Sequence, residues 1–165
     1  MSDLIKMQVI VKNYNLQASG DLDSLYSQVR LEDAEGNTFY FKQVVIPNYL
    51  KGHGAFVTDV PRVWYFKKLS KKAIVILAFE TNSGKVEYDL DVVKFIARST
   101  VIKGIVMSIA TVPMAVIVAT ATFGLGLALI PVGMWYGYRN IFKVPSMISR
   151  KRLLSDFAAH GIVVR

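Results

Sequence analysis

Apolar and polar residues are distributed very unevenly along this chain, and residues 104–138 contain no charged residue at all. The hydrocarbon core of a bilayer is about 30 Å thick, and about 20 residues of helix cross it. The uncharged stretch is too long for one such helix and suits two short ones. We therefore expect a two-helix transmembrane hairpin, with spans at about 101–122 and 125–142. A pair of buried helices in a soluble protein and one long kinked span are the alternatives.

The residues before this stretch alternate between apolar and polar with the period of β-strands. This pattern predicts strands at 5–12, 26–32, 38–46, 55–58, 62–66, 73–80 and 85–90, with hairpin turns at 33–37 and 81–84. Six or seven short strands in about 90 residues favour a small antiparallel β-barrel or sandwich, of OB-like or SH3-like size. Residues 91–98 have helical spacing and lead directly into the first span.

The predicted fold class is therefore a membrane α+β protein with three parts. These are a cytoplasmic β-rich domain at 1–92, the helical transmembrane hairpin at 93–143, and a cytoplasmic juxtamembrane helix and tail at 144–165. The tail is expected to be a short basic amphipathic helix, with an apolar side formed by Met147, Ile148, Leu154, Phe157 and Ala158.

Strand 73–80 is apolar on both faces, so one face needs a cover from outside the primary core. The expected cover is the amphipathic segment 146–159, with Gly161 ending the helix. Residues 162–164 would then add an edge strand to the sheet. A strand from another protein is the alternative occupant of that edge.

The distribution of charge predicts the orientation of the hairpin. The net charge is +8, and basic residues flank the uncharged stretch on both sides: Arg98, Lys103, Arg139, Lys143, Arg150, Lys151 and Arg152. Because basic residues favour the cytoplasmic side, we expect both termini in the cytoplasm and the protein in the inner membrane of a bacterium. Trp135, Tyr136 and Tyr138 are expected at headgroup depth, where aromatic rings gather.

Small residues recur at helical spacing on one face of each predicted span. They are Ser108, Thr111, Ala115 and Ala119 in the first span, and Gly126, Gly133 and Gly137 in the second. Small side chains allow helix backbones to approach closely in lipid. We expect this stripe to pack the two helices against each other, and association between copies of the chain is the alternative.

Residues that carry chemistry are sparse. The absence of cysteine excludes disulfides and thiolate metal sites. His53 and His160 have no partner at metal-ligand spacing, and the acidic row Glu87, Asp89 and Asp91 fits a solvated strand face. No catalytic motif is present. We expect no catalytic residue, no metal and no cofactor.

One basic and aromatic cluster is a candidate surface for an anionic partner. It comprises Trp64, Tyr65, Lys67, Lys68, Lys71 and Lys72, with residues 39–42 as possible neighbours. Such a surface suits anionic lipid headgroups or the bases and phosphates of nucleic acid. A solvated turn beside core aromatics explains the same residues without any ligand.

These features favour a non-enzymatic integral membrane interaction protein. It would be an accessory, assembly or regulatory subunit of a membrane complex, or a protein of the immunity or exclusion type. The expected partners are anionic membrane lipids together with another protein or a second copy of the chain, and nucleic acid is the least favoured partner. The alternatives are a membrane-bound enzyme that acts on lipid or a membrane-embedded substrate, and a membrane-tethered nucleic-acid-binding β-barrel.

Overall fold

The computed structural model describes residues 3–162 and residue 164, and the chain separates into two compact units. The first unit contains Met1–Val93 together with Leu153–Arg165, and the second contains Lys94–Arg152. The β-rich unit is therefore discontinuous in sequence, because its C-terminal residues are joined to it through the whole second unit.

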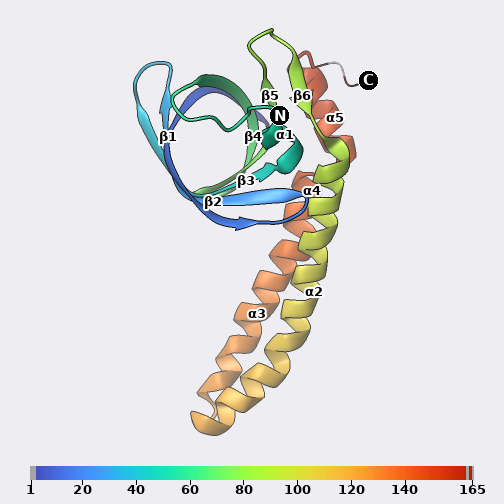
Figure 1. The fold of residues 1–165 in the computed structure, drawn as a ribbon. Coiled ribbons are helices and arrows are strands. Elements are labelled where there is room, and N and C mark those ends of the chain that lie inside the picture. The colour runs from blue at the N-terminus through green and yellow to red at the C-terminus, as the bar shows by residue number, and fades with distance from the viewer. Residues whose placement is uncertain (1–2, 163, 165) are drawn as a thin grey trace. The chain divides into compact units, whose positions relative to one another are not determined.

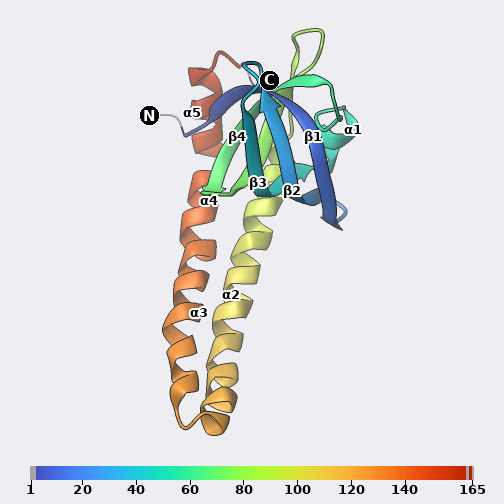
Figure 2. The same ribbon diagram turned by 90° about the vertical axis from the view of Figure 1, so that its left-hand side faces the viewer.

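The first unit is built on a β-sheet whose described strands are β1 (Ile5–Ser19), β2 (Asp23–Asp33), β3 (Thr38–Pro47), β4 (Pro61–Ser70), β5 (Ala73–Glu80) and β6 (Val86–Tyr88). The strands lie in the order β3-β2-β1-β4-β5-β6, and β3 also pairs in parallel with β5. This last pairing closes five strands into a barrel (Figures 1 and 2). A short helix, α1 (Asn48–Gly52), connects β3 to β4. The connectivity is that of the OB fold, a five-stranded Greek-key barrel.

Most of the predicted strands and both predicted hairpin turns are confirmed. Asp33 fixes the turn between β2 and β3, because its Oδ1 accepts hydrogen bonds from the backbone N–H groups of Glu35 (2.9 Å) and Asn37 (2.8 Å). The predicted strand at 55–58 is wrong, because this segment is a loop whose β-pairing with the sheet is an isolated bridge from Thr58 to Val11. Ala55 and Phe56 are buried in succession, and Val57 is exposed, so the segment lacks the alternation of a strand.

The core fills the inside of the barrel and is rich in aromatic rings. Tyr26 stacks on Phe56 with ring centroids 4.3 Å apart, and Phe56 stacks on Trp64 at 5.6 Å. The Trp64 indole is fully buried and donates a hydrogen bond of 2.8 Å from Nε1 to the carbonyl oxygen of Ala55. The loop at 55–58 is therefore an integral part of the core.

The C-terminal helix α5 (Arg150–Ala159) covers part of the barrel, as the two apolar faces of β5 predict. Phe157 is fully buried, and its ring lies 5.8 Å from that of Tyr88. Gly161, with a φ of +73°, ends the helix. The N–H groups of Gly161 and Ile162 bond back to the carbonyls of Ala158 and Phe157, which is a Schellman cap.

The buried face of α5 differs from the predicted one. Leu153, Asp156 and Phe157 are buried, whereas Leu154 is half-buried and Ala158 is exposed. Because Asp156 lies on the buried face, apolar periodicity alone does not identify that face. The predicted edge strand at 162–164 falls partly on Val163, which lies outside the described residues, while Ile162 and Val164 are not in a strand.

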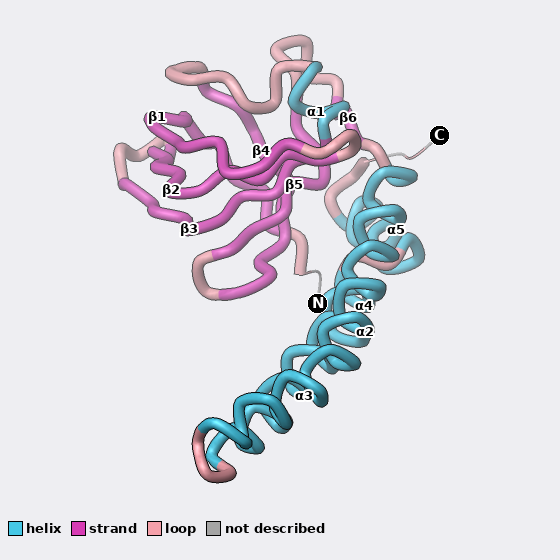
Figure 3. The backbone as a smooth tube through the Cα atoms, turned by 60° about the horizontal axis from the view of Figure 1, so that its bottom comes forward, coloured by secondary structure: helices cyan, strands magenta, loops and turns pink. Residues whose placement is uncertain are grey.

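The second unit contains most of helix α2 (Leu90–Ala121) and a return limb (Figures 1 and 3). The limb consists of a 3-10 turn, η1 (Leu125–Ala128), then α3 (Leu129–Tyr138), a π-helical turn, η2 (Arg139–Lys143), and α4 (Val144–Met147). Within the described residues, α2 is the one helix long and apolar enough to cross a membrane, and 11% of its most apolar window is buried. The predicted second span at 125–142 is therefore not one regular helix, because the limb changes helix type twice within it.

Candidate binding surfaces

Small residues hold the two limbs of the second unit in close contact. A Cβ atom placed on Gly126 would overlap the backbone of Ala119, and one on Gly133 or Gly137 would overlap the side chain of Thr111 or Ser108. Ala115 is fully buried on the same face. The small-residue stripe thus packs the two limbs of one chain against each other, and replacing these glycines would push the limbs apart.

Hydroxyl groups along α2 donate hydrogen bonds to the carbonyls of the same helix. Ser108 Oγ bonds to the Gly104 carbonyl at 2.9 Å, and Thr111 Oγ1 bonds to the Met107 carbonyl at 2.6 Å. Thr100, Thr120 and Thr122 make equivalent bonds. A polar side chain satisfied in this way does not need water, which makes the helix compatible with an apolar surrounding.

The basic and aromatic residues expected at a membrane interface lie on the surface of their own elements. Lys103, Lys143 and the run 150–152 are exposed, as is Arg98, and Arg139 is half-buried. Trp135, Tyr136 and Tyr138 are exposed on α3, and the Tyr138 ring lies 5.3 Å from Phe142. Apart from Arg139, all of these side chains are exposed.

The predicted anionic-partner patch is divided between the core and the surface. Trp64 and Lys67 are fully buried and Tyr65 is 2% exposed, so these three residues are not available to a ligand. Lys68, Lys71 and Lys72 remain exposed. These residues are buried because β4 is packed on both sides. Residues 64–67 are buried in succession, and Tyr65 and Lys67 contact His160 and Asp156 on the side away from the barrel core.

Lys67 forms a buried ion pair with the C-terminal helix. Its Nζ lies 2.5 Å from Oδ2 of Asp156, and the exposed fractions of the two side chains are 0% and 7%. Both charges are shielded from water, so each depends on the other for compensation. The pair joins β4 to α5 and fixes the helix at one place on the barrel.

A groove on the outer face of β1, β2 and β3 gathers polar, basic and aromatic side chains. It has a volume of about 430 Å³, and its lining includes Gln17, Gln28, Tyr40, Lys42, Gln43 and Lys72. Lys72, in the β4–β5 turn, accepts backbone hydrogen bonds on its carbonyl oxygen from the N–H groups of Lys42 (2.8 Å) and Gln43 (3.1 Å). The structure thus places Lys72 beside Tyr40 and Lys42, which belong to the segment 39–42 that the sequence suggested as a neighbour of the basic cluster.

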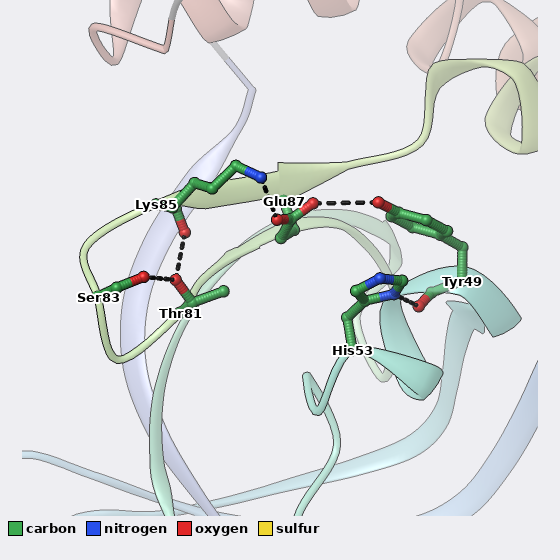
Figure 4. A network of polar contacts seen from close by, with 6 residues as sticks. All are labelled: Tyr49, His53, Thr81, Ser83, Lys85 and Glu87. Atoms are coloured by element: carbon green, nitrogen blue, oxygen red, sulfur yellow. Dashed lines mark hydrogen bonds and ion pairs between the residues drawn. The ribbon is translucent and has the colours of Figure 1, made fainter.

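A second polar cluster joins α1 to β6 (Figure 4). Its residues Tyr49, Lys85 and Glu87 line a separate pocket of about 610 Å³. Glu87 is at its centre: its Oε1 lies 2.8 Å from Nζ of Lys85, and its Oε2 accepts a hydrogen bond of 3.1 Å from the Tyr49 hydroxyl. The imidazole of His53 lies beside the Tyr49 ring with centroids 4.1 Å apart and the ring planes tilted by 35°. Its Nδ1 lies 2.7 Å from the Tyr49 carbonyl oxygen.

The hydrogen bonds of this cluster shift the pKa values of its members. The hydrogen bond from Lys85, helped by that from Tyr49, holds the pKa of Glu87 below its usual value. The bond to Glu87 raises the pKa of Tyr49 and likewise that of Lys85. Glu87 is thus stabilised as a carboxylate, a state suited to pairing rather than to donating a proton.

The rest of the predicted acidic row does not continue along the strand. Asp89 lies before α2, and its Oδ1 accepts a hydrogen bond of 2.9 Å from the backbone N–H of Val92, which is an N-cap interaction. Asp91 lies in the first turn of α2. Among the residues that the structure describes, no group of three or more acidic or histidine side chains is arranged to hold a metal ion.

Replacing Glu87 by glutamine should remove a pH-dependent contribution to stability. A depressed native pKa stabilises the fold above the unfolded pKa of about 4.5, and this contribution disappears as the pH falls through the native pKa. We expect Glu87→Gln to lower the stability by no more than about 1 kcal/mol at neutral pH. Unfolding midpoints of the two proteins should differ at pH 7 and converge in acid. Midpoints that stay equally far apart at every pH would contradict this assignment.

Comparison of the chain with protein-family models, with curated proteins and with solved structures finds no match in any of the three.

Proposed function

We propose that this protein is a non-enzymatic integral membrane protein that holds an OB-type barrel at the cytoplasmic surface as an interaction module. In this proposal α2 and the return limb both cross the membrane as a hairpin. The barrel then serves as an accessory or regulatory subunit of a membrane complex, or as an exclusion-type protein that binds an incoming component.

The observation that carries this proposal is the closure of the first unit by residues from both ends of the chain. Asp156 pairs with Lys67 at 2.5 Å, and His160 Nε2 lies 3.1 Å from the carbonyl oxygen of Leu4. Since the chain leaves this unit after Val93 and rejoins it at Leu153, these contacts support a hairpin that returns to the side of the membrane from which it starts. One long kinked span would separate these partners, so the contacts favour the hairpin over that alternative.

The surface of the second unit supports insertion into lipid. Large apolar side chains are exposed on both limbs, for example Ile109 (68%) and Ile117 (65%) on α2, and Val132 (63%) and Leu125 (78%) on the return limb. An apolar surface of this extent is costly in water and favourable in a hydrocarbon layer. The uncharged stretch 104–138 covers the turn between the limbs as well.

The absence of cysteine from the chain makes a direct test of the topology possible. Single cysteines are introduced at three exposed positions: Ala34→Cys in the β2–β3 turn, Phe123→Cys between the limbs, and Ser155→Cys in α5. Each variant is treated in intact cells with a maleimide that does not cross membranes. We expect labelling of Phe123→Cys in intact cells, and of the other two only after the membrane is opened.

Inverted membrane vesicles serve as the control, since they should label Ala34→Cys and Ser155→Cys but not Phe123→Cys. Labelling of Ser155→Cys alone from outside would contradict the hairpin. Extraction of the wild-type protein by alkaline carbonate, without detergent, would contradict integral insertion altogether. If the topology holds, a partner that co-purifies stoichiometrically in mild detergent is the expected sign of the interaction function, and an isolated monomer in every detergent would contradict it.

A further inference from the structure

We propose that the groove on β1, β2 and β3 binds single-stranded nucleic acid. In this site Tyr40 stacks on a base, while Lys42 and Lys72 contact the flanking phosphates. All residues that line the groove belong to the barrel unit, so binding there does not depend on how the second unit crosses the membrane. It also moves the candidate surface away from Trp64, Tyr65 and Lys67, which are buried.

The aromatic residue of the groove is placed to stack on a ligand. The Tyr40 side chain is 56% exposed near the start of β3, where its cross-strand partner is Arg30 on β2. Both residues are exposed, so the ring lies in a polar and basic surrounding. A base can stack on such a ring whatever its identity, which gives affinity without strong sequence preference.

Backbone hydrogen bonds hold the two lysines of the groove close to each other. Two hydrogen bonds to the Lys72 carbonyl hold the β4–β5 turn against β3, so Lys42 and Lys72 come from distant parts of the sequence to one site. None of the lining residues is acidic. Glu32, further along β2, is paired with Lys12 at 3.5 Å. The groove therefore offers two lysines whose charge is not neutralised by a carboxylate in the lining.

Amide side chains in the groove favour a nucleotide, which presents base edges as well as phosphate, over a bare phosphate group. Gln17, Gln28 and Gln43 each offer both a donor and an acceptor, which match the mixed donors and acceptors on base edges. A phosphate group offers acceptors only. The Oε1 atom of Gln28 accepts a 2.9 Å hydrogen bond from Asn15 Nδ2, which orients the amide.

The backbone of Gln28 is strained in a way that fits a binding role. Its φ is +54°, the left-handed region that residues other than glycine seldom adopt. The pairing of β1 with β2 shifts register between Asn13 and Asn15, opposite this residue, as at a β-bulge. Bulges redirect side chains and occur often beside functional sites. In OB barrels the face of strands 2 and 3, with the β1–β2 and β4–β5 loops, is the one that holds oligonucleotides, which is a likeness at the level of the fold.

The test uses the full chain in nanodiscs of phosphatidylcholine, which carries no net charge. The probe is a fluorescent oligonucleotide of about ten thymidines, a length within the range of about 4–16 nucleotides that one OB-type barrel covers. Binding is measured by fluorescence anisotropy over a series of salt concentrations. We expect saturable binding that weakens as salt increases.

Four variants locate the site. Tyr40→Ala should weaken binding about 5-fold or more, whereas Tyr40→Phe should keep most of it. The double variant Lys42→Ala with Lys72→Ala should reduce the slope of log affinity against log salt by about 1.4, which is about 0.7 for each lost phosphate contact. Gln28→Gly should relax the backbone, so it should weaken binding without lowering the unfolding temperature.

Exposed residues outside the groove provide matched controls. Tyr49→Ala removes a tyrosine that is 41% exposed, and Lys51→Ala removes an exposed lysine from α1. Both should leave the affinity unchanged. Equal loss of binding in Tyr40→Ala and Tyr49→Ala would overturn the proposal. So would binding to vesicles that contain phosphatidylglycerol without binding to the oligonucleotide, since that result assigns the groove to lipid headgroups.

Discussion

Replacing Lys67 by alanine is expected to destabilise the barrel unit by about 3–5 kcal/mol, because the change leaves Asp156 as a buried carboxylate without its cation. The Lys67 side chain is fully buried and that of Asp156 is 7% exposed, so little water is available to compensate the remaining charge. Asp156→Ala should cost a similar amount by leaving the ammonium group unpaired. A loss this large threatens the fold of a small domain.

The measurement is denaturant unfolding in detergent, followed by Trp64 fluorescence in a background that carries Trp135→Phe. The informative control replaces both charges at once, as Lys67→Met with Asp156→Leu. Because buried ion pairs are costly to desolvate, this apolar pair should recover most of the stability lost in either single variant. Single variants as stable as the wild type would show that the ion pair does not form in solution.

Replacing Gly126 by alanine is expected to open the hairpin of the second unit. The added Cβ would overlap the backbone at Ala119 and lie 2.6 Å from the backbone carbon of Val118, and backbone atoms cannot rotate away as a side chain does. Overpacking of this kind costs about 1–3 kcal/mol. Gly133→Ala should be milder, because its Cβ meets the side chain of Thr111.

The opening of the hairpin can be measured by energy transfer between dyes on Lys103→Cys and Lys143→Cys. These positions lie near Gly104 and Ile141, which approach each other across the hairpin. Transfer should fall at a lower concentration of sodium dodecyl sulfate in Gly126→Ala than in the parent protein. Gly52→Ala, where a Cβ meets no atom within 4 Å, is the matched control. An unchanged midpoint for Gly126→Ala would refute the tight packing.

The large-scale organisation could be predicted from the sequence because it depends on periodicity. Strict alternation in residues 5–11 and the turn residues Asp33 and Gly36 led to the correct hairpins, and the uncharged stretch 104–138 led to the long apolar helix. Helix α1 was missed, since five residues are too few to show a helical period. The break-up of the return limb was missed as well, because hydropathy does not distinguish 3-10, α and π turns.

The candidate sites were harder to predict because they depend on long-range pairing. The cluster of aromatic and basic residues at 64–72 looked like one surface, but in a strand packed on both sides Trp64 and Lys67 both point into protein. Asp156 was not recognised as the partner of Lys67, since 89 positions of sequence separate them and a lone acid in a basic helix carries no signal. Gln28 likewise became informative only once its backbone angle was known.

The discontinuity of the barrel unit also sets an order for biosynthesis. As the chain is made from its N-terminus, all of the barrel strands precede the hairpin, but Asp156 and Phe157 follow it. Until they emerge, Lys67 has no carboxylate from α5 and Tyr88 lacks the ring of Phe157 beside it. The last step in maturation of the barrel unit therefore follows synthesis of the hairpin, and a nascent chain whose limbs fail to return keeps a closed barrel without its C-terminal helix.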